Sequence, residues 1–229
     1  MKRKKSKAIS GFVASILIVT TLLLPMALFT ACAGEVAIEF EDISSSDWYY
    51  SYVMAGIRFG FITGDGGESL RFEPDRYVTQ GEFITMLGRL HEYGHEAIGA
   101  PGDDPFYERY VEWALEMEII HEYKYWDLRP YDFITREQKA VIVYRYIDVF
   151  DLHGYFLHEF FIAEGEFWDA DDMSNWAITR IERFRAHLKV YGIGEFYFRP
   201  HSLANRADTV AIISAVGFAV YDLVHPLRG

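Results

Sequence analysis

Two arginines, Arg136 and Arg206, each follow a short polar residue that is expected to begin a helix. The amino-terminal end of a helix carries partial positive charge, so a cation at this position is unfavourable by itself. Each arginine therefore indicates either an anionic ligand or a carboxylate of the protein as its partner. The sequence alone leaves both possibilities open.

A zinc-peptidase motif, H-E-x-x-H, occurs at His91-Glu92-Tyr93-Gly94-His95. Two histidines one helical turn apart can bind zinc, with Glu92 as the general base. The motif is expected to lie where a helix ends, because Gly94, Gly99 and Pro101 follow at once. A zinc metallopeptidase is therefore only a remote alternative, and we expect no enzyme activity, no catalytic residue, no metal site and no cofactor.

The segments that would position the arginines recur as three similar copies. In each copy a proline precedes a short polar residue by the same interval, since 79 − 74, 135 − 130 and 205 − 200 all give five. A short polar residue with an acceptor three positions later forms a capping box, which starts a helix. The three boxes are Thr79-Gln80-Gly81-Glu82, Thr135-Arg136-Glu137-Gln138 and Asn205-Arg206-Ala207-Asp208.

Another helix is expected before each box. Apolar residues recur there at helical spacing, as in Tyr49, Val53 and Ile57 of the first copy. Ser, Asp or Asn clusters precede these runs and can cap them, while Gly and Pro mark the loop between the two helices. The sequence thus predicts helix, loop, helix three times.

The whole pattern resembles the S-layer homology family, whose repeats carry an F-x-D opening, an aromatic first helix, an I-x-G turn, an F-x-P loop and a T-R-x-E box. The matching residues are Phe40-x-Asp42, Trp48 and Phe72-x-Pro74 in copy one, Phe106-Tyr107 and Leu128-x-Pro130 in copy two, and Phe167-x-Asp169, Trp176 and Phe198-x-Pro200 in copy three. The resemblance implies an all-α fold, with three helix-loop-helix repeats in a pseudo-threefold arrangement and ligand grooves between neighbouring copies.

The predicted organisation has three repeats, at 40–91, 101–146 and 167–217. The capping boxes lie 56 residues apart (135 − 79) and then 70 residues apart (205 − 135). We therefore expect an aromatic-rich connector at 147–166 between copies two and three. A short tail, 218–229, follows the third copy.

Residues 1–33 are predicted to be an export signal, because a basic start is followed by a long apolar run and a small-residue end. Ala31-x-Ala33 fits signal peptidase cleavage, while Phe29-Thr30-Ala31-Cys32 resembles a lipoprotein signal that would lipidate Cys32. Loss of residues 1–31 removes five positive charges and changes the net charge from −12 to −17. So acidic a chain is a poor partner for nucleic acid.

The S-layer homology resemblance also implies a ligand, a secondary cell-wall polysaccharide whose pyruvate ketal carries a carboxylate. Arginine at a helix start would bind the anion, tryptophan would stack on a sugar, glycine would allow close approach, and aspartate would accept hydrogen bonds or cap a helix. Residues carried over to these roles are Asp42, Trp48, Gly64, Arg136, Asp169, Trp176, Gly192 and Arg206. Each tryptophan could instead belong to the core.

Three positions depart from the family pattern, and at one of them only Asp103 or Asp104 of copy two approximates the aspartate. Gln80 replaces the arginine in copy one, and Glu122 stands where copy two should have glycine. With these departures, either one groove still binds the ligand or none does.

We expect non-covalent attachment to the cell wall, at the cell surface, with the membrane involved only if Cys32 is lipidated. The alternative is a degenerate scaffold that binds other envelope proteins, through its acidic surface or through residues 147–166.

Overall fold

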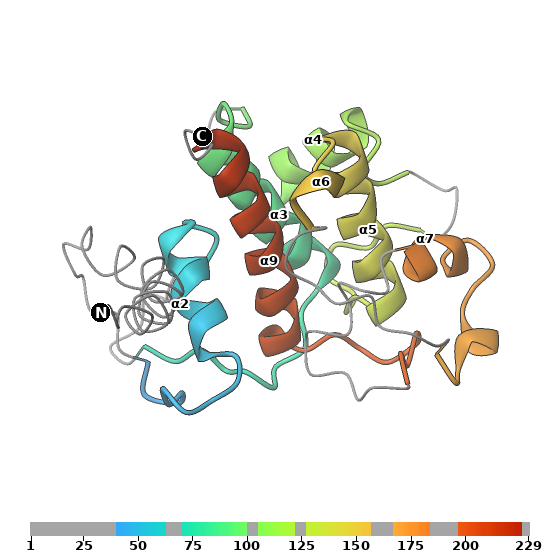
Figure 1. The fold of residues 1–229 in the computed structure, drawn as a ribbon, viewed down its shortest axis with the longest axis horizontal. Coiled ribbons are helices and arrows are strands. Elements are labelled where there is room, and N and C mark those ends of the chain that lie inside the picture. The colour runs from blue at the N-terminus through green and yellow to red at the C-terminus, as the bar shows by residue number, and fades with distance from the viewer. Residues whose placement is uncertain are drawn as a thin grey trace, which may run out of the picture. The chain divides into compact units, whose positions relative to one another are not determined.

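The described residues form three pairs of helices, with two short elements between the last two pairs. The computed structural model describes residues 40–62, 70–99, 105–121, 127–156, 167–183 and 197–225, all within the unit Phe40–Gly229. The first helices are α2 (Tyr50–Arg58), α4 (Glu108–Glu116) and α7 (Ile178–Arg183), and the second helices are α3 (Gln80–Gly94), α5 (Arg136–Val149) and α9 (Arg206–Val224) (Figure 1). The short α6 (His153–Phe156) and the 3-10 turn η1 (Ala170–Asp172) lie between α5 and α7.

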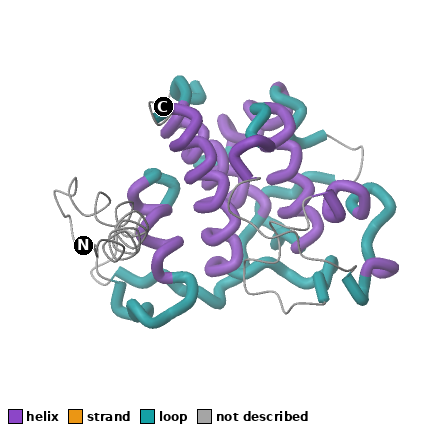
Figure 2. The backbone as a smooth tube through the Cα atoms, in the orientation of Figure 1, coloured by secondary structure: helices purple, strands orange, loops and turns teal. Residues whose placement is uncertain are grey.

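The all-α fold class is confirmed. Within the described residues the chain forms helices and loops, and its only extended pairings are isolated bridges (Figure 2). The helices continue slightly past the predicted repeat ends, because α3 ends at Gly94, α5 at Val149 and α9 at Val224. The predicted leader, with Cys32, lies outside the described residues, as does the second half of the predicted connector, 157–166.

The three predicted capping boxes begin the second helices. The Thr79 hydroxyl accepts a hydrogen bond from the Glu82 N–H at 3.2 Å, and the Glu82 carboxylate accepts one from the Thr79 N–H at 2.9 Å. Thr135 and Gln138 exchange the same pair of bonds. In the third copy the Asn205 side chain accepts from the Asp208 N–H at 2.8 Å. These bonds satisfy N–H groups that a helix start leaves without intrahelical partners.

A ring of backbone hydrogen bonds joins the three copies just before their boxes. The Val78 N–H donates to the Ala204 carbonyl at 3.0 Å, the Ala204 N–H to the Ile134 carbonyl at 2.9 Å, and the Ile134 N–H to the Val78 carbonyl at 2.9 Å. All three side chains are fully buried. The ring therefore returns to its starting residue after visiting each copy once.

The same cyclic order appears at the helix starts. The first N–H groups of α3 donate to the loop of copy two, those of α5 to the loop of copy three, and those of α9 to the loop of copy one. The bonds run from Gln80 to Asp132, from Arg136 to Ser202 and from Arg206 to Arg76, each at 2.9 Å. This order supports the pseudo-threefold arrangement, which stays a prediction.

Each second helix packs on the first helix of the next copy. The packed pairs are α3 with α4, α5 with α7, and α9 with α2, and Figure 1 shows α2 beside α9. Gly88 of α3 lets the ring of Tyr110 from α4 come close, because a Cβ at Gly88 would collide with that ring. In the same way Gly217 of α9 receives the ring of Phe59.

Helix α9 is long and apolar enough to cross a membrane by length and composition. However, 61% of its most apolar stretch is buried inside this fold. Burial against other helices of the same chain accounts for its apolar character, as expected for a core helix.

Candidate ligand-binding site

Both predicted aspartates accept hydrogen bonds from the backbone of a loop. The Asp42 carboxylate accepts hydrogen bonds from the N–H groups of Phe72 and Glu73, both at 2.7 Å. The Asp169 carboxylate accepts from Phe198 and Arg199 at 2.8 and 2.6 Å. Burial raises the pKa of Asp42, but backbone N–H donors, including those of Phe72 and Glu73, together with the charge of Arg71 outweigh this effect, so its pKa lies below the ordinary value.

The bonds to aspartate stabilise a strained turn in each loop. Glu73 and Arg199 have φ of 55° and 56°, in the left-handed region that residues other than glycine rarely adopt. A carboxylate that accepts two N–H bonds at this point offsets the strain. Asp42 and Asp169 therefore have a structural role in the loops that precede the capping boxes.

Replacing Asp169 with alanine is expected to lower the free energy of unfolding by about 2 kcal/mol, because two hydrogen bonds to a charged acceptor are lost. Urea denaturation would measure the change. Asp171→Ala is the matched control, since Asp171 is exposed in η1 and should change stability by less than about 0.5 kcal/mol. Equal losses in the two variants would contradict this role for Asp169.

Arg136 has a carboxylate of the protein as its partner. Its Nη1 donates to Asp208 at 2.9 Å and its Nε donates to the Phe198 carbonyl at 2.8 Å. The guanidinium also lies 5.5 Å from the centre of the Phe198 ring, and the residue is only 6% exposed. The first alternative from the sequence, an anionic ligand, is thus not needed to explain Arg136.

Arg206 occupies the corresponding position in copy three, but its surroundings differ. Its guanidinium lies 5.2 Å from the centre of the Phe72 ring. Glu82, the residue that corresponds to Asp208, is bound instead by Arg76, with Nη1 2.9 Å from Oε1. Among the described residues the Nε of Arg206 has no hydrogen-bond partner. Arg206 is therefore the better candidate for an external anion.

A row of aromatic rings leads from Arg206 to the surface. Phe72 stacks on Tyr49 at 6.0 Å between ring centres, and Trp48 contacts Tyr49 at 5.4 Å and Tyr52 at 6.4 Å. We call Arg206, Phe72, Tyr49, Trp48 and Tyr52 the Arg206 row. Trp48 is 47% exposed, so it is available as a flat apolar surface. The backbone carbonyl of Tyr52 accepts a bond from the Ser214 hydroxyl at 2.7 Å, which ties the row to α9.

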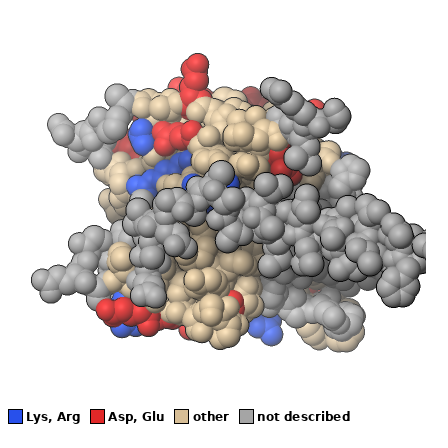
Figure 3. All heavy atoms as spheres, turned by 60° about the vertical axis from the view of Figure 1, so that its left-hand side comes forward, with Lys and Arg blue, Asp and Glu red and all other residues tan. Residues whose placement is uncertain are grey.

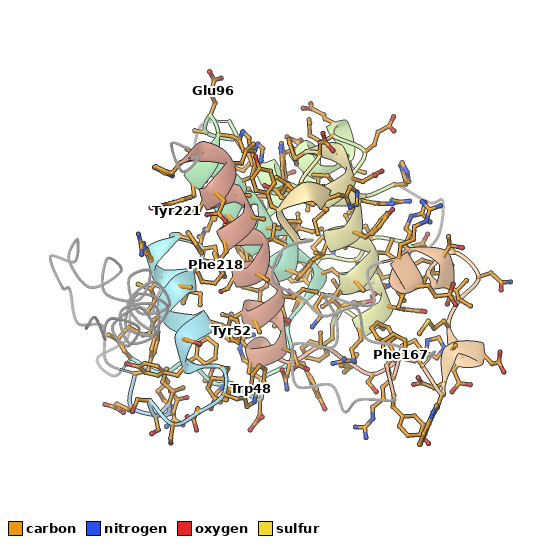
Figure 4. All side chains as sticks on the ribbon, viewed as in Figure 1. Trp48, Tyr52, Glu96, Phe167, Phe218 and Tyr221 are labelled. Carbon is orange, nitrogen blue, oxygen red and sulfur yellow. The ribbon has the colours of Figure 1, made fainter. Side chains whose placement is uncertain are left out.

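The Arg206 row lies where copies one and three meet. Figure 4 shows Tyr52 of α2, and Trp48 just before this helix, on the side that lies toward α9. Where Figure 3 shows described residues of this face, acidic and basic side chains gather near its upper and lower ends, and uncharged residues lie beside them. An apolar platform beside one cation can bind the apolar side of a sugar and an acidic substituent together.

The structure divides the predicted site residues into two groups. Asp42 and Arg206 contact Phe72, to which Trp48 is linked through Tyr49, whereas Asp169 and Arg136 contact Phe198. Trp176 is half-buried, and its carbonyl accepts a bond from Arg180 Nη1 at 2.9 Å. Gly64 and Gly192 lie outside the described residues.

The sequence analysis did not predict that each arginine stacks on the phenylalanine of the next copy. A signal for it does exist in the sequence. Arg136 and Arg206 face loops that contain Phe198 and Phe72, whereas Gln80 faces the loop that has Leu128 instead. The Gln80 side chain accepts a bond from the Arg129 N–H at 3.2 Å, so the arginine and the aromatic ring are lost together.

The H-E-x-x-H motif lies in a packed aromatic cluster. The rings of His91 and His95 stack at 4.2 Å, and His91 also packs against Trp113 and Phe150. Burial, with a smaller effect of His95, lowers the pKa of His91 to about 4. Glu92 accepts a bond from Tyr110 at 3.1 Å and pairs with Arg109, so all three residues have structural contacts. Within the described residues no group of three or more His, Cys, Asp or Glu could hold a metal ion.

Comparisons with known proteins identify the first copy. Residues 39–84 match the family model of the S-layer homology domain. Over 153 residues the chain is 28% identical to exoglucanase XynX of Acetivibrio thermocellus, an alignment that covers 65% of this chain and 14% of the relative. It is 29% identical over 153 residues to an amylopullulanase of Thermoanaerobacterium thermosulfurigenes, covering 65% of this chain and 8% of the relative.

The resemblance to the S-layer homology family is thereby confirmed for residues 39–84. This domain is a binding module that is associated with anchoring to the cell wall. The chain spans only a small part of the curated relatives that it matches, so the enzyme names of those relatives do not extend to it.

Proposed function

We propose that this chain binds cell-wall polysaccharide without a covalent bond, and so attaches to the bacterial cell wall at the cell surface. The observation that carries the proposal is the Arg206 row, because it joins an exposed tryptophan to a cation next to the matched domain. Trp48 and Asp42 both belong to the matched residues 39–84.

The row suits a sugar that carries a carboxylate, such as a pyruvate ketal. The Trp48 face would stack on the apolar side of the sugar ring. The guanidinium of Arg206 would bind the carboxylate, since its planar donors match two carboxylate oxygens. Arg136 is buried against Asp208, so the corresponding position between copies two and three contributes to folding instead. We therefore propose a single working groove, between copies three and one.

The test is co-sedimentation of the exported, purified chain with peptidoglycan sacculi. Three preparations are compared: sacculi with the secondary polysaccharide, sacculi without it, and sacculi from which mild acid has removed ketal pyruvate. Binding is expected only to the first. Arg206→Gln should weaken this binding roughly tenfold, since a charge-assisted hydrogen bond is worth about 1.5–3 kcal/mol.

Arg129→Gln provides the matched control, because Arg129 is an exposed arginine that pairs only with nearby surface carboxylates. Its binding should equal that of the unchanged chain. Equal binding to all three preparations would overturn the polysaccharide proposal, and no binding to any of them would direct the search to envelope proteins. Lipidation of Cys32 stays a separate prediction.

A further inference from the structure

A pocket of 460 Å³ lies between the second and third copies, away from the Arg206 row. Helices α5 and α7 and the turn after α4 line it. Three arginines contribute to its wall, namely Arg145, Arg180 and Arg183. None of them was singled out from the sequence, because none belongs to a repeat motif.

The pocket lies where the packing differs from that at the junction between copies one and two. In α3 and α4, Gly88 receives the ring of Tyr110. Counted from the capping boxes, Tyr144 of α5 stands at the position of Gly88. Counted from Phe106 and Trp176, which precede the first helices, Arg180 stands at the position of Tyr110. A large ring on α5 and a cation on α7 thus replace the close contact of tyrosine with glycine.

Hydrogen bonds help to orient two of the guanidinium groups. Arg180 Nη1 donates to the Trp176 carbonyl at 2.9 Å, and Arg183 Nη1 donates to the Tyr144 hydroxyl at 3.5 Å. Arg145 is 6% exposed, so its charge acts where water screens it poorly. The arrangement concentrates positive charge within a chain whose net charge is −12.

Carboxylates also line the pocket, but they are fewer than the arginines. Glu118 and Asp148 contribute, together with His121. Asp148 is already engaged by His153, whose Nε2 lies 3.2 Å from the carboxylate. Among the described residues that line the pocket, three guanidinium groups outnumber two carboxylates, so this part of the wall is positive even with His121 neutral.

We infer that this pocket binds a compact oxyanion, a carboxylate or phosphate group. Guanidinium groups present planar pairs of donors that match such oxygens, and the Tyr144 hydroxyl adds a polar group beside them. The volume admits the anion with a small organic residue attached. The inference does not rest on sugar binding at the Arg206 row, since either site could bind without the other.

Isothermal titration calorimetry of the exported, purified chain tests the inference. The probes are inorganic phosphate and pyruvate, each titrated at an ionic strength held constant with sodium chloride. Saturable binding of at least one probe is expected. Arg180→Gln and Arg183→Gln should each weaken that binding roughly tenfold, whereas Arg129→Gln, which removes the same charge elsewhere, should leave it unchanged.

The probe that binds identifies the chemistry of the ligand. Binding of phosphate alone indicates a phosphorylated ligand, and binding of pyruvate alone indicates a ligand with a carboxylate. Binding of both indicates that the pocket recognises the charge and shape of an oxyanion. The inference is overturned if neither probe binds above chloride, or if both pocket variants bind as tightly as the unchanged chain. Sedimentation with sacculi is unaffected by these outcomes, so the two proposals fail separately.

Discussion

Replacing Arg136 with methionine is expected to lower the free energy of unfolding by about 3 kcal/mol. The variant keeps much of the side-chain volume but removes the ion pair with Asp208 and the bond to the Phe198 carbonyl. Removing one partner of a buried pair leaves the other charge without compensation, which costs more than the pair contributed. Urea denaturation at pH 7 would measure the loss.

Two controls separate this effect from a general loss of charge. Arg129→Met removes an exposed arginine and should change stability by less than about 0.5 kcal/mol. Arg136→Lys keeps a positive charge but has no Nε, so it should lose less than Arg136→Met. If Arg136→Met cost no more than Arg129→Met, the pairing with Asp208 would contribute nothing to the junction between copies two and three.

Lys139→Met is expected to raise the free energy of unfolding at pH 6, on the order of 4 kcal/mol. Lys139 is 4% exposed on α5, one helical turn after Arg136. Burial, reinforced by the positive charge of Arg136, lowers the pKa of Lys139 from 10.5 to about 7. Each pKa unit corresponds to about 1.4 kcal/mol, and methionine removes the whole penalty.

The gain should depend on pH in a defined direction. Below pH 7 both the folded and the unfolded chain bind the Lys139 proton, so the folded state carries the full penalty. Between pH 7 and 10.5 only the unfolded chain binds it, so the unchanged protein gains roughly 1.4 kcal/mol per pH unit. The advantage of Lys139→Met should therefore shrink as the pH rises from 7. An advantage that stayed constant between pH 6 and pH 9 would show that Lys139 titrates normally in the fold.

The starts of the second helices could be predicted because their causes are local. A capping box needs only residues three positions apart, and Thr79, Thr135 and Asn205 each accept the predicted hydrogen bond. The ends were less certain, since no glycine in a left-handed turn follows α5 or α9. Helix α9 continues to Val224 because its apolar side chains find partners in α2 and α3.

The role of each arginine could not be decided from the sequence, because the deciding partners are distant. Asp208 follows Arg136 by 72 residues, and only the folded chain brings them together. Arg206 differs because Arg76 occupies Glu82, the carboxylate that corresponds to the partner of Arg136. Arg76 and Arg206 come from distant segments of the chain, so the sequence does not show which of them pairs with Glu82. The aspartates of the F-x-D openings were likewise ambiguous until their bonds to Phe72 and Phe198 were known.

The ring of Val78, Ile134 and Ala204 has a consequence for how the chain folds. In a linear array each repeat contacts only its neighbours, so a partial array can be stable. Here the bond between Val78 and Ala204 joins residues more than half the chain apart. Closing so long a loop costs entropy before any contact is gained, and it slows folding. During synthesis, the bond between Val78 and Ala204 can form only after the third copy has been made. We therefore expect the three copies to fold as one cooperative unit.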